Sequence, residues 1–249
     1  MQKSSLSHKV FAVVPAAGSG TRYGPGTRKP FLLLNGKPLI IWALEILESV
    51  PDIAHIIPVL RKSDIPGGKQ IFQQYKISKI IRTVEGGKER QDSVLNALAG
   101  IRENNSIVLI HDGARPFITG EMIQSALHEL DGFDGVVLGM PPKDTIKETE
   151  HGLIQKTLKR DSLWAIQTPQ VFPAQVITAA YEHAYRERYY STDDAALVER
   201  YGGRVKVIKG SYRNIKITTP EDLAFAELLL SQRHIQQKNR PIKKPATFI

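Results

Sequence analysis

Short apolar runs alternate along the chain with longer segments that repeat their apolar residues every three to four positions. The apolar runs are typical of buried strands and occupy residues 10–16, 55–60, 79–84, 106–112, 134–140 and 204–210. The segments with a helical period lie at residues 38–47, 90–101, 121–130, 173–187, 192–202 and 220–230. This alternation predicts an α/β fold: a Rossmann-like, mostly parallel sheet with helices on both faces. We expect a single domain over residues 1–232, with ligands bound at the carboxyl ends of the strands, near a topological switch point.

Residues 143–167 interrupt the alternation. They form short alternating pieces around a turn near residues 151–152, which predicts a hairpin, a protruding β-arm, in place of another strand and helix. The arm carries apolar side chains that need a surface to pack on, namely Ile154, Leu158 and Leu163. A partner subunit offers such a surface, and so does the arm's own domain. The sequence leaves both open.

Composition narrows the class of protein. The 249 residues include no cysteine, which excludes a disulfide, a thiolate zinc site and a cysteine nucleophile and suits the cytoplasm. The formal net charge is +9, but five cations lie in residues 233–249, where periodicity ends near Gln236 and where we expect a flexible basic tail. The apolar run near the N-terminus is too short for a signal-peptide core, and no apolar stretch is long enough to span a membrane. We therefore expect small anionic ligands, and neither a nucleic acid nor a membrane, as partners.

The stretch VVPAAGSGTRYGPGTRKPF, residues 13–31, passes from the first predicted strand into a glycine-rich loop. The loop holds Arg22, Arg28 and Lys29 with no acidic residue among them. Glycines let backbone amides approach an anion closely, so we interpret the stretch as a phosphate-binding loop. It matches neither the P-loop nor the G-x-G-x-x-G fingerprint, whose sixth position is Tyr23, and this argues against a dinucleotide-dependent oxidoreductase. A surface turn with solvated cations is the alternative.

Two further strand ends carry candidate ligand-binding residues. In EGGKERQDSV, glycines 86–87 precede a predicted helix whose N-terminus favours an anion, and Ser93 lies in its first turns. In SIVLIHDGARPF, Asp112 and Arg115 follow a buried strand, where they are suited to a sugar hydroxyl or divalent ion and to a phosphate. The alternatives are an ordinary Gly-Gly turn and an Asp-Gly turn closed by a local ion pair. We expect His111 to be packed in the interior and not to act as a base.

Three more segments combine basic and hydroxyl-bearing residues and favour a site for two anionic ligands. They are KDTIK (143–147), LKRDSLWAIQTPQ (158–170) and NIKITTPEDL (214–223). In the last, Lys216 precedes a strong helix N-terminus, and a merely solvated lysine is the alternative. The chain has no G-x-S-x-G elbow and no H-E-x-x-H motif. We therefore expect electrostatic catalysis without a covalent intermediate. A phosphomonoester nucleophile would need no general base, because its second pKa is near about 6.

Six motifs in this order resemble those of one family. PAAGSGTRYGPGTRKPF, GGKERQDSV, HDGARPF, KDTIK, LWAIQTPQ and NIKITTPEDL, spread over residues 10–230, are similar to the motifs of 2-C-methyl-D-erythritol 4-phosphate cytidylyltransferases of the non-mevalonate isoprenoid pathway. The resemblance implies a nucleotidyltransferase that transfers the cytidylyl group of CTP to 2-C-methyl-D-erythritol 4-phosphate and releases pyrophosphate. It also implies Mg²⁺ bound mainly through the CTP phosphates, with no protein residue as a metal ligand, and a homodimer in which the β-arm clasps the second subunit.

The resemblance implies a role for each matching residue. The catalytic residues it implies are Arg22, Lys29, Arg160 and Lys216. The nucleotide-binding residues it implies are Pro15, Ala16, Ala17, Gly18, Gly87, Ser93, Asp112 and Lys216. The substrate-binding residues it implies are Asp112, Arg115, Thr145, Arg160 and Thr168. Arg22 and Lys29 would stabilise the transition state at the α-phosphorus, and Arg160 would act across the dimer interface.

Two other functions share part of this pattern. A cytidylyltransferase for another polyol phosphate, such as ribitol 5-phosphate, shares the nucleotide motifs, but KDTIK joined to Arg160 resembles the methylerythritol branch. A basic nucleic-acid-binding module requires aromatic residues between its cations or a recognition helix, and the glycine loops offer neither.

Two prolines depart from the expected patterns. Pro30 follows Lys29 where the family usually has glutamine, which fixes the backbone and removes an amide donor. Pro58 indicates that the strand predicted at residues 55–60 lies at an edge of the sheet or is bulged.

Overall fold

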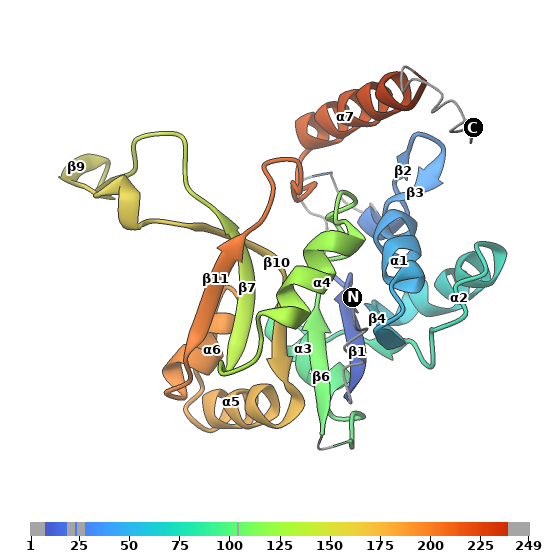
Figure 1. Ribbon diagram of the computed structural model, residues 1–249, viewed down its shortest axis with the longest axis horizontal. Helices are drawn as coiled ribbons and strands as arrows, with labels where there is room; N and C mark the ends of the chain where they lie inside the picture. Colours follow the sequence, from blue (N-terminus) through green and yellow to red (C-terminus); the bar gives the residue numbers. More distant parts are fainter. Residues whose placement is uncertain (1–7, 19–22, 24–27, 104, 239–249) are drawn as a thin grey trace, which may run out of the picture.

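A seven-stranded sheet forms the centre of the molecule, in the order β11, β7, β10, β6, β1, β4 and β5 (Figure 1). The computed structural model describes residues 8–18, 23, 28–103 and 105–238, with the side chains of 233–238 left out. Its strands are β1 (Lys9–Pro15), β2 (Leu33–Leu34), β3 (Lys37–Pro38), β4 (Ile53–Leu60), β5 (Val84–Glu85), β6 (Ser106–Ile110), β7 (Gly135–Met140), β8 (Lys147–Glu150), β9 (Leu153–Thr157), β10 (Ala165–Pro173) and β11 (Val205–Lys209). Its α-helices are α1 (Leu39–Ser49), α2 (Ile65–Gln74), α3 (Arg90–Leu98), α4 (Gly120–His128), α5 (Ala174–Arg186), α6 (Ala195–Arg200) and α7 (Pro220–Lys238). Short 3₁₀ helices with both ends in the described residues are η2 (Lys29–Phe31), η3 (Lys62–Asp64) and η4 (Arg160–Ser162).

The strand directions confirm the predicted mostly parallel sheet. β1 is parallel to both β4 and β6, β4 is parallel to β5, and β7 is parallel to β11. β10 runs antiparallel to its two neighbours, β6 and β7. From β1 the chain passes to β4 and β5 on one side and then to β6 on the other. The strand order therefore reverses between β1 and β6, whose carboxyl ends mark the switch point where such folds bind ligands.

Side chains along the central strands alternate between two apolar cores. In β1, Val10, Ala12 and Val14 pack in one core, and Phe11 and Val13 pack in the other. The first core is covered by α1, α2 and α4, and the second by α3, α5 and α6. A strand buried on both faces needs an unbroken apolar run, because every side chain meets a helix layer. The predicted helices on both faces are confirmed.

Two predicted segments differ from the structure. α2 was not predicted, because the sequence IPGGKQIFQQ contains a proline and two glycines that usually break helices; here the proline stands in the first turn, where its missing N–H costs nothing. Residues 79–84 were predicted as a strand, but only an isolated bridge from Ile80 to Ile56 and the short β5 form there. The sheet therefore ends in a weakly paired edge next to β4.

Pro58 lies in β4, the second strand from this edge, and so not at the edge itself. The backbone of Ile56 exchanges hydrogen bonds with residues 79 and 81 on the β5 side, and Pro58, two residues on, faces the same side. Pairing resumes only at Val59 with Val84. The missing N–H of Pro58 therefore falls in a gap of the ladder, which explains how a proline is tolerated in this strand.

The predicted β-arm is confirmed as a two-stranded hairpin of β8 and β9 that pairs with no strand of the main sheet. Its turn residues His151 and Gly152 both have positive φ values, 50° and 80°, as a tight hairpin turn requires. Figure 1 shows the arm projecting away from the sheet at the upper left. Ile154 is 64% exposed, so the arm does not bury this side chain on its own domain. The arm is shorter than predicted, since Ala165 already belongs to β10.

α7 packs on a third, smaller apolar cluster with β2 and α1, through Leu229 and Leu230 among others. The helix continues to Lys238, into the segment expected as a basic tail. The division of the chain into a domain at 1–232 and a tail at 233–249 stays a prediction. Among the described residues, no helix has both the length and the apolar character that a membrane crossing demands.

Candidate active site

A cavity of about 450 Å³ lies at the carboxyl ends of β1, β4 and β6, next to the switch point. Its lining comes from the ends of these strands, from the turn before α3 and from the loop before α7. The lining residues are Pro15, Ala16, Ala17, Gly18, Lys29, Pro30, Arg61, Gly87, Lys88, Glu89, Arg90, Ser93, Asp112, Gly113, Ala114, Lys216 and Thr218. Five of these are lysine or arginine and two are acidic, so the cavity favours an anionic ligand.

Small residues allow the backbone segments at the floor of the cavity to approach one another closely. A Cβ on Gly86 would lie 2.2 Å from the Cβ of Ala17, and a Cβ on Gly113 would lie 3.2 Å from that of Ala16. Any larger side chain here would fill the space between β1 and its neighbours. The predicted nucleotide segment at residues 15–18 therefore forms a tightly packed floor of the cavity, a region termed the slot.

The turn before α3 is held by hydrogen bonds within the segment. The Ser93 hydroxyl accepts a bond from the Gly87 amide (3.1 Å) and donates to the Glu89 carbonyl oxygen (3.0 Å). Glu89 and Asp92 form a capping box at the helix N-terminus. Ser93 lines the cavity, and its hydroxyl also fixes the shape of the Gly87 turn. The shape of the turn is thus fixed, with the Gly87 amide donating to Ser93 Oγ and the Glu89 amide donating to Asp92 Oδ2.

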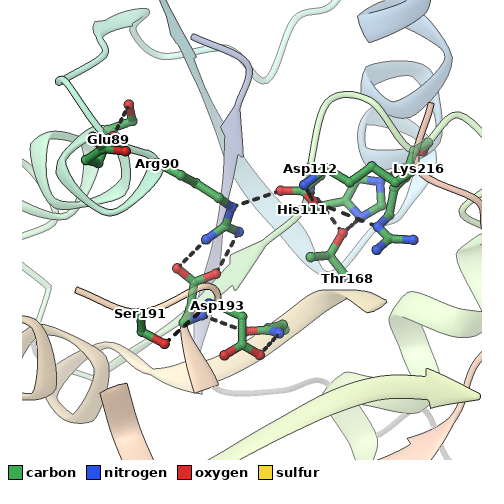
Figure 2. A network of polar contacts seen from close by, with 12 residues as sticks. Glu89, Arg90, His111, Asp112, Thr168, Ser191, Asp193 and Lys216 are labelled. Carbon is green, nitrogen blue, oxygen red and sulfur yellow. Dashed lines mark hydrogen bonds and ion pairs between the residues drawn. The ribbon is translucent and has the colours of Figure 1, made fainter. Parts of the chain in front are cut away.

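Asp112 lies at the end of β6 with three cations around its carboxylate. Lys216 Nζ lies 2.7 Å from Oδ2, Arg90 Nε donates to Oδ1 at 3.1 Å, and Arg115 Nε lies 3.9 Å from Oδ2. Burial alone would raise the pKa of the Asp112 carboxyl, but the charges of Arg90 and Lys216 outweigh it and hold that pKa well below its ordinary value. The carboxylate is therefore ionised at neutral pH and orders the three cations beside the cavity. Figure 2 shows this arrangement.

Arg90 is a site residue that the sequence analysis missed. Its Nη1 and Nη2 donate to the two oxygens of Asp194 at 2.9 and 2.8 Å, and its Nε reaches Asp112. Asp194 is fully buried and also accepts a hydrogen bond from the Tyr181 hydroxyl at 2.5 Å. Burial lowers the pKa of Arg90, but Asp194 and Asp112 raise it further, so the guanidinium stays charged. The sequence feature that could have identified Arg90 is its position in the first turn of a predicted helix that follows a Gly-Gly turn.

His111 is packed in the interior, as predicted, and its two ring nitrogens contact Thr168 and the backbone of Arg115. The Asp112 amide donates to Thr168 Oγ1 at 3.1 Å, and Thr168 Oγ1 lies 3.0 Å from His111 Nδ1. His111 Nε2 lies 3.1 Å from the carbonyl oxygen of Arg115, which can only accept, so Nε2 carries the hydrogen and Nδ1 accepts from Thr168. Burial lowers the pKa of His111 to about 4, which leaves the ring neutral at pH 7.

Arg115 and Thr168, two predicted substrate-binding residues, lie behind Asp112 and do not line the cavity. Arg115 Nη1 donates to the carbonyl oxygen of Asn214 at 2.7 Å, and Asn214 Nδ2 donates to the carbonyl oxygen of Thr168 at 2.8 Å. Burial lowers the pKa of Arg115. These bonds tie β10 and the loop before α7 to the end of β6, and so fix where Lys216 stands.

The cations of the glycine-rich loop are placed differently from one another. Lys29 lines the cavity, and Arg22 lies outside the described residues. The expectation that no acid accompanies these cations is wrong for Arg28, whose Nε lies 3.3 Å from Asp64 Oδ1. Asp64 belongs to η3, which is distant in sequence, so the composition of the loop alone could not predict this ion pair. Arg61, at the end of β4, is a further cation of the cavity that the sequence analysis did not single out.

Thr145 and Arg160, predicted substrate-binding residues of the arm, are exposed and do not line the cavity of this chain. Arg160 Nη1 donates to the carbonyl oxygen of Lys143 at 2.7 Å, which joins the two stems of the arm. A single chain therefore does not bring these residues together with Lys29 or Asp112.

The cavity has few groups to offer a divalent metal. Its two acidic side chains are Glu89, which caps α3, and Asp112, which is held by cations. The described residues contain no group of three or more histidine or acidic side chains placed to hold a metal ion. A metal ion in this cavity would need most of its oxygen ligands from a bound polyphosphate, and the residues present fit that arrangement.

Known proteins resemble this chain over nearly its full length. A family model described as 2-C-methyl-D-erythritol 4-phosphate cytidylyltransferase (IspD) matches residues 10–232. The protein of that name from Bacillus mycoides is 42% identical over 226 residues, which cover 91% of this chain and 98% of that protein. The one from Geobacter metallireducens is 43% identical over 228 residues, covering 90% and 98%.

Solved structures agree with the sequence matches. The crystal structure of 4-diphosphocytidyl-2C-methyl-D-erythritol synthase from Anaerococcus prevotii superposes with a TM-score of 0.80 at 33% identity, covering 90% of this chain and 99% of that one. The structure of 2-C-methyl-D-erythritol 4-phosphate cytidylyltransferase from Francisella tularensis gives a TM-score of 0.75 at 28% identity, covering 88% and 99%.

Proposed function

The chain belongs to the 2-C-methyl-D-erythritol 4-phosphate cytidylyltransferase (IspD) family, and we propose that the cavity beside Asp112 is where its two substrates react. The enzyme is a nucleotidyltransferase that transfers the cytidylyl group of CTP to 2-C-methyl-D-erythritol 4-phosphate in isoprenoid biosynthesis. The observation that carries the assignment of the cavity is its charge: five cations and two acids line it, and one of those acids already has cationic partners. A triphosphate matches this excess of positive charge.

The proposed reaction needs no catalytic base. A phosphate oxygen of methylerythritol phosphate attacks the α-phosphorus of CTP, a new P–O bond forms, and the bond to the β-phosphate oxygen breaks with its electrons leaving on pyrophosphate. The nucleophile is mostly ionised at neutral pH because its second pKa is near about 6. The protein's contribution is then to position both phosphates and to neutralise charge at the α-phosphorus. Lys29 lines the cavity and is proposed for this role together with Arg22.

On the nucleotide side, we assign the slot at residues 15–18 and the turn at Gly87 and Ser93 to the cytosine and ribose. The narrow spacing between Ala17 and Gly86 leaves no room for a larger floor residue, which suits a pyrimidine. Asp112 and Lys216 line the same cavity and would contact the ribose and the phosphates. Asp112 also holds Lys216 in place through their 2.7 Å contact.

On the acceptor side, Arg115, Thr145, Arg160 and Thr168 stay proposals. Arg115 and Thr168 lie behind Asp112, so their described contacts support a role in holding Asp112 and Lys216 toward the acceptor. Thr145 and Arg160 lie on the arm, and they would reach a cavity only in a second subunit. Arg160 and Lys216 would then both contact the acceptor phosphate and position it for attack.

A homodimer formed through the β-arm is therefore part of the proposal. Leu153 is 69% and Ile154 is 64% exposed on the arm, and Trp164 is 38% exposed at its base. Apolar side chains presented on a projecting hairpin support burial against a partner subunit. We also propose a cytoplasmic location, with which the lack of cysteine in the sequence is compatible.

We further propose that Mg²⁺ acts with CTP. The ion would be held mainly by the triphosphate, because the two acidic side chains of the cavity lining are already engaged by the protein. When bound, it would neutralise phosphate charge and lower the barrier to attack.

The experiment that tests this function is pyrophosphate release with CTP and Mg²⁺ in three parallel reactions, with methylerythritol 4-phosphate, with ribitol 5-phosphate and with no acceptor. The expected result is release only with methylerythritol 4-phosphate. Release only with ribitol 5-phosphate would preserve the mechanism but overturn the roles of Thr145 and Arg160. Release with neither acceptor would refute the proposed function and favour a binding protein.

A further inference from the structure

The segment that follows β4 contacts the glycine-rich loop at both of the loop's described ends. Arg61 Nη2 donates to the carbonyl oxygen of Gly18 at 2.6 Å, and Arg61 Nε donates to that of Ala17 at 3.3 Å. Three residues further on, Asp64 Oδ1 lies 3.3 Å from Nε of Arg28. One short segment thus holds the beginning of the loop through an arginine and its end through an aspartate.

Packing adds a third point of support. Phe31, at the end of η2, packs against the core cluster that contains Leu60 and Phe72. A Cβ on Gly68 of α2 would lie 2.5 Å from Leu60 Cδ1 and 3.5 Å from Phe31 Cζ. The glycine therefore lets α2 lie directly against Leu60 at the end of β4, in contact with Phe31. Since η2 begins at Lys29, the support under Phe31 is also support for the proposed catalytic lysine.

Residues 60–64 are themselves held in place by the rest of the domain. Leu60 is fully buried, and its carbonyl oxygen accepts the Gly86 amide at 2.8 Å. The Asp64 amide donates to the Arg61 carbonyl oxygen at 2.9 Å, which closes η3. The Asp64 side chain is only 3% exposed, whereas that of Arg28 is 62% exposed. A buried carboxylate needs a partner, and Arg28 supplies it from the loop.

We propose that Arg61 and Asp64 are positioning residues for the nucleotidyl transfer, a clamp that sets where Lys29 stands relative to the CTP phosphates. The proposal rests on the proposed function, because it requires Lys29 to act on CTP. Arg61 lines the cavity too, so it also adds positive charge beside the triphosphate. A displacement of about 1 Å at a reacting centre can lower the rate by on the order of a hundredfold. A clamp that prevents such a displacement of Lys29 therefore offsets the unfavourable burial of the Asp64 charge.

The test compares Arg61→Gln, Asp64→Asn and Arg28→Gln with the wild type, measuring kcat and KM for each substrate separately. We expect kcat/KM for CTP to fall about tenfold or more in Arg61→Gln and Asp64→Asn, with KM for methylerythritol phosphate changed less than about twofold. Lys62→Ala is the matched control, because this side chain of the same 3₁₀ helix is 83% exposed. It should leave both substrates' parameters unchanged.

A double variant separates positioning from a merely structural role. If Arg28 and Asp64 act through each other, the combination of Arg28→Gln and Asp64→Asn should be no worse than the more impaired single variant. Arg28→Gln also tests the pair from its exposed side, in case the buried substitution at Asp64 impairs folding. Additive losses, or a lowered melting temperature with kcat/KM for CTP unchanged, would overturn the proposal.

Equilibrium binding of CTP, measured by calorimetry, gives a readout that does not depend on turnover. Arg61→Gln should bind CTP about tenfold more weakly than the wild type if the clamp and its charge act on the nucleotide. A wild type that releases no pyrophosphate would refute the proposed function. An active wild type, with normal CTP binding and turnover in Arg61→Gln and Asp64→Asn, would refute only the clamp.

Discussion

Lys216 Nζ lies 2.7 Å from Asp112 Oδ2, which joins the loop before α7 to the end of β6 in the lining of the cavity. The other oxygen of the same carboxylate accepts from Arg90, so one acid fixes cations that come from two different elements. An anionic substrate entering this cavity meets positive charges whose positions are already set. Such preorganised charge is what a transfer between two phosphates requires.

Replacing Asp112 by asparagine should therefore impair both activity and stability. The substitution keeps the shape but removes the charge next to Lys216 and Arg115, and it leaves Arg90 with Asp194 as its one acidic partner among the described residues. We expect kcat/KM to fall by about a hundredfold or more and the free energy of unfolding to fall by about 3 kcal/mol. Steady-state kinetics and urea unfolding check this, with exposed Asp131→Asn as the control. Turnover near the wild-type rate would contradict the role given to Asp112.

Lys29→Ala should lower kcat by about a hundredfold, equivalent to about 3 kcal/mol of transition-state stabilisation. Lys29 lines the cavity at the start of η2, and its loss removes a charge proposed to act at the α-phosphorus. The same outcome is expected for Arg22→Ala. Single-turnover measurements isolate the chemical step, and exposed Arg102→Ala serves as the control. If Lys29→Ala turned over like the wild type, the assignment of the cavity to catalysis would fail.

Mixing two inactive variants tests whether the arm completes the site of a partner. If Arg160 acts in the other subunit, a heterodimer of Arg160→Ala and Lys29→Ala chains contains one intact site and one doubly damaged site. Random mixing after subunit exchange should then restore about a quarter of wild-type activity. Activity is measured on the exchanged mixture and on each variant alone. No recovery in a mixture shown to contain heterodimers would place Arg160 outside the partner's site.

The sequence pattern was sufficient to predict the layers of the fold. Apolar residues form an unbroken run in a strand buried on both faces, whereas they recur every three to four positions in an amphipathic helix. The sequence pattern also placed Asp112 and Lys29 at one cavity, since carboxyl ends of neighbouring parallel strands meet at the same edge. α2 was missed because its proline and glycines, read locally, look like a turn. Its stability comes from packing of Phe72 on the core, which no local propensity reports.

The remaining polar partners of the site could not be predicted because they depend on tertiary contact. Asp194 meets Arg90, and Asp64 meets Arg28, from elements far away in the chain. Residues that form an ion pair do not recur at a fixed spacing in the sequence. Their pairing can therefore be identified only once the packing of the helices and strands that carry them is known.

Gly86→Ala should weaken CTP binding more than it slows the chemical step. The new Cβ would lie 2.2 Å from the Cβ of Ala17 and 3.0 Å from Ser93 Oγ, so the slot proposed for the base must change shape. We expect KM for CTP to rise about tenfold while KM for methylerythritol phosphate changes little. Gly67→Ala is a matched control, because nothing lies within 4 Å of its added Cβ. An unchanged KM for CTP would contradict the placement of the base.

His111 should make the stability of the enzyme depend on pH between about 4 and 6.5. Burial lowers its pKa to about 4, against an ordinary value of 6.5, so within this window the unfolded chain binds a proton that the folded chain does not. Stability is therefore retained above the unfolded pKa and is lost as pH falls toward the folded pKa. Between pH 7 and pH 5 the loss from this one residue is about 2 kcal/mol. In His111→Gln, whose amide can still donate to the Arg115 carbonyl and accept from Thr168, that loss should disappear, whatever the variant's stability at pH 7. Urea unfolding of both proteins at the two pH values measures the difference, and carboxylates titrate alike in both, so their contribution cancels. An equal loss in wild type and variant would show that His111 is not the group that is buried neutral.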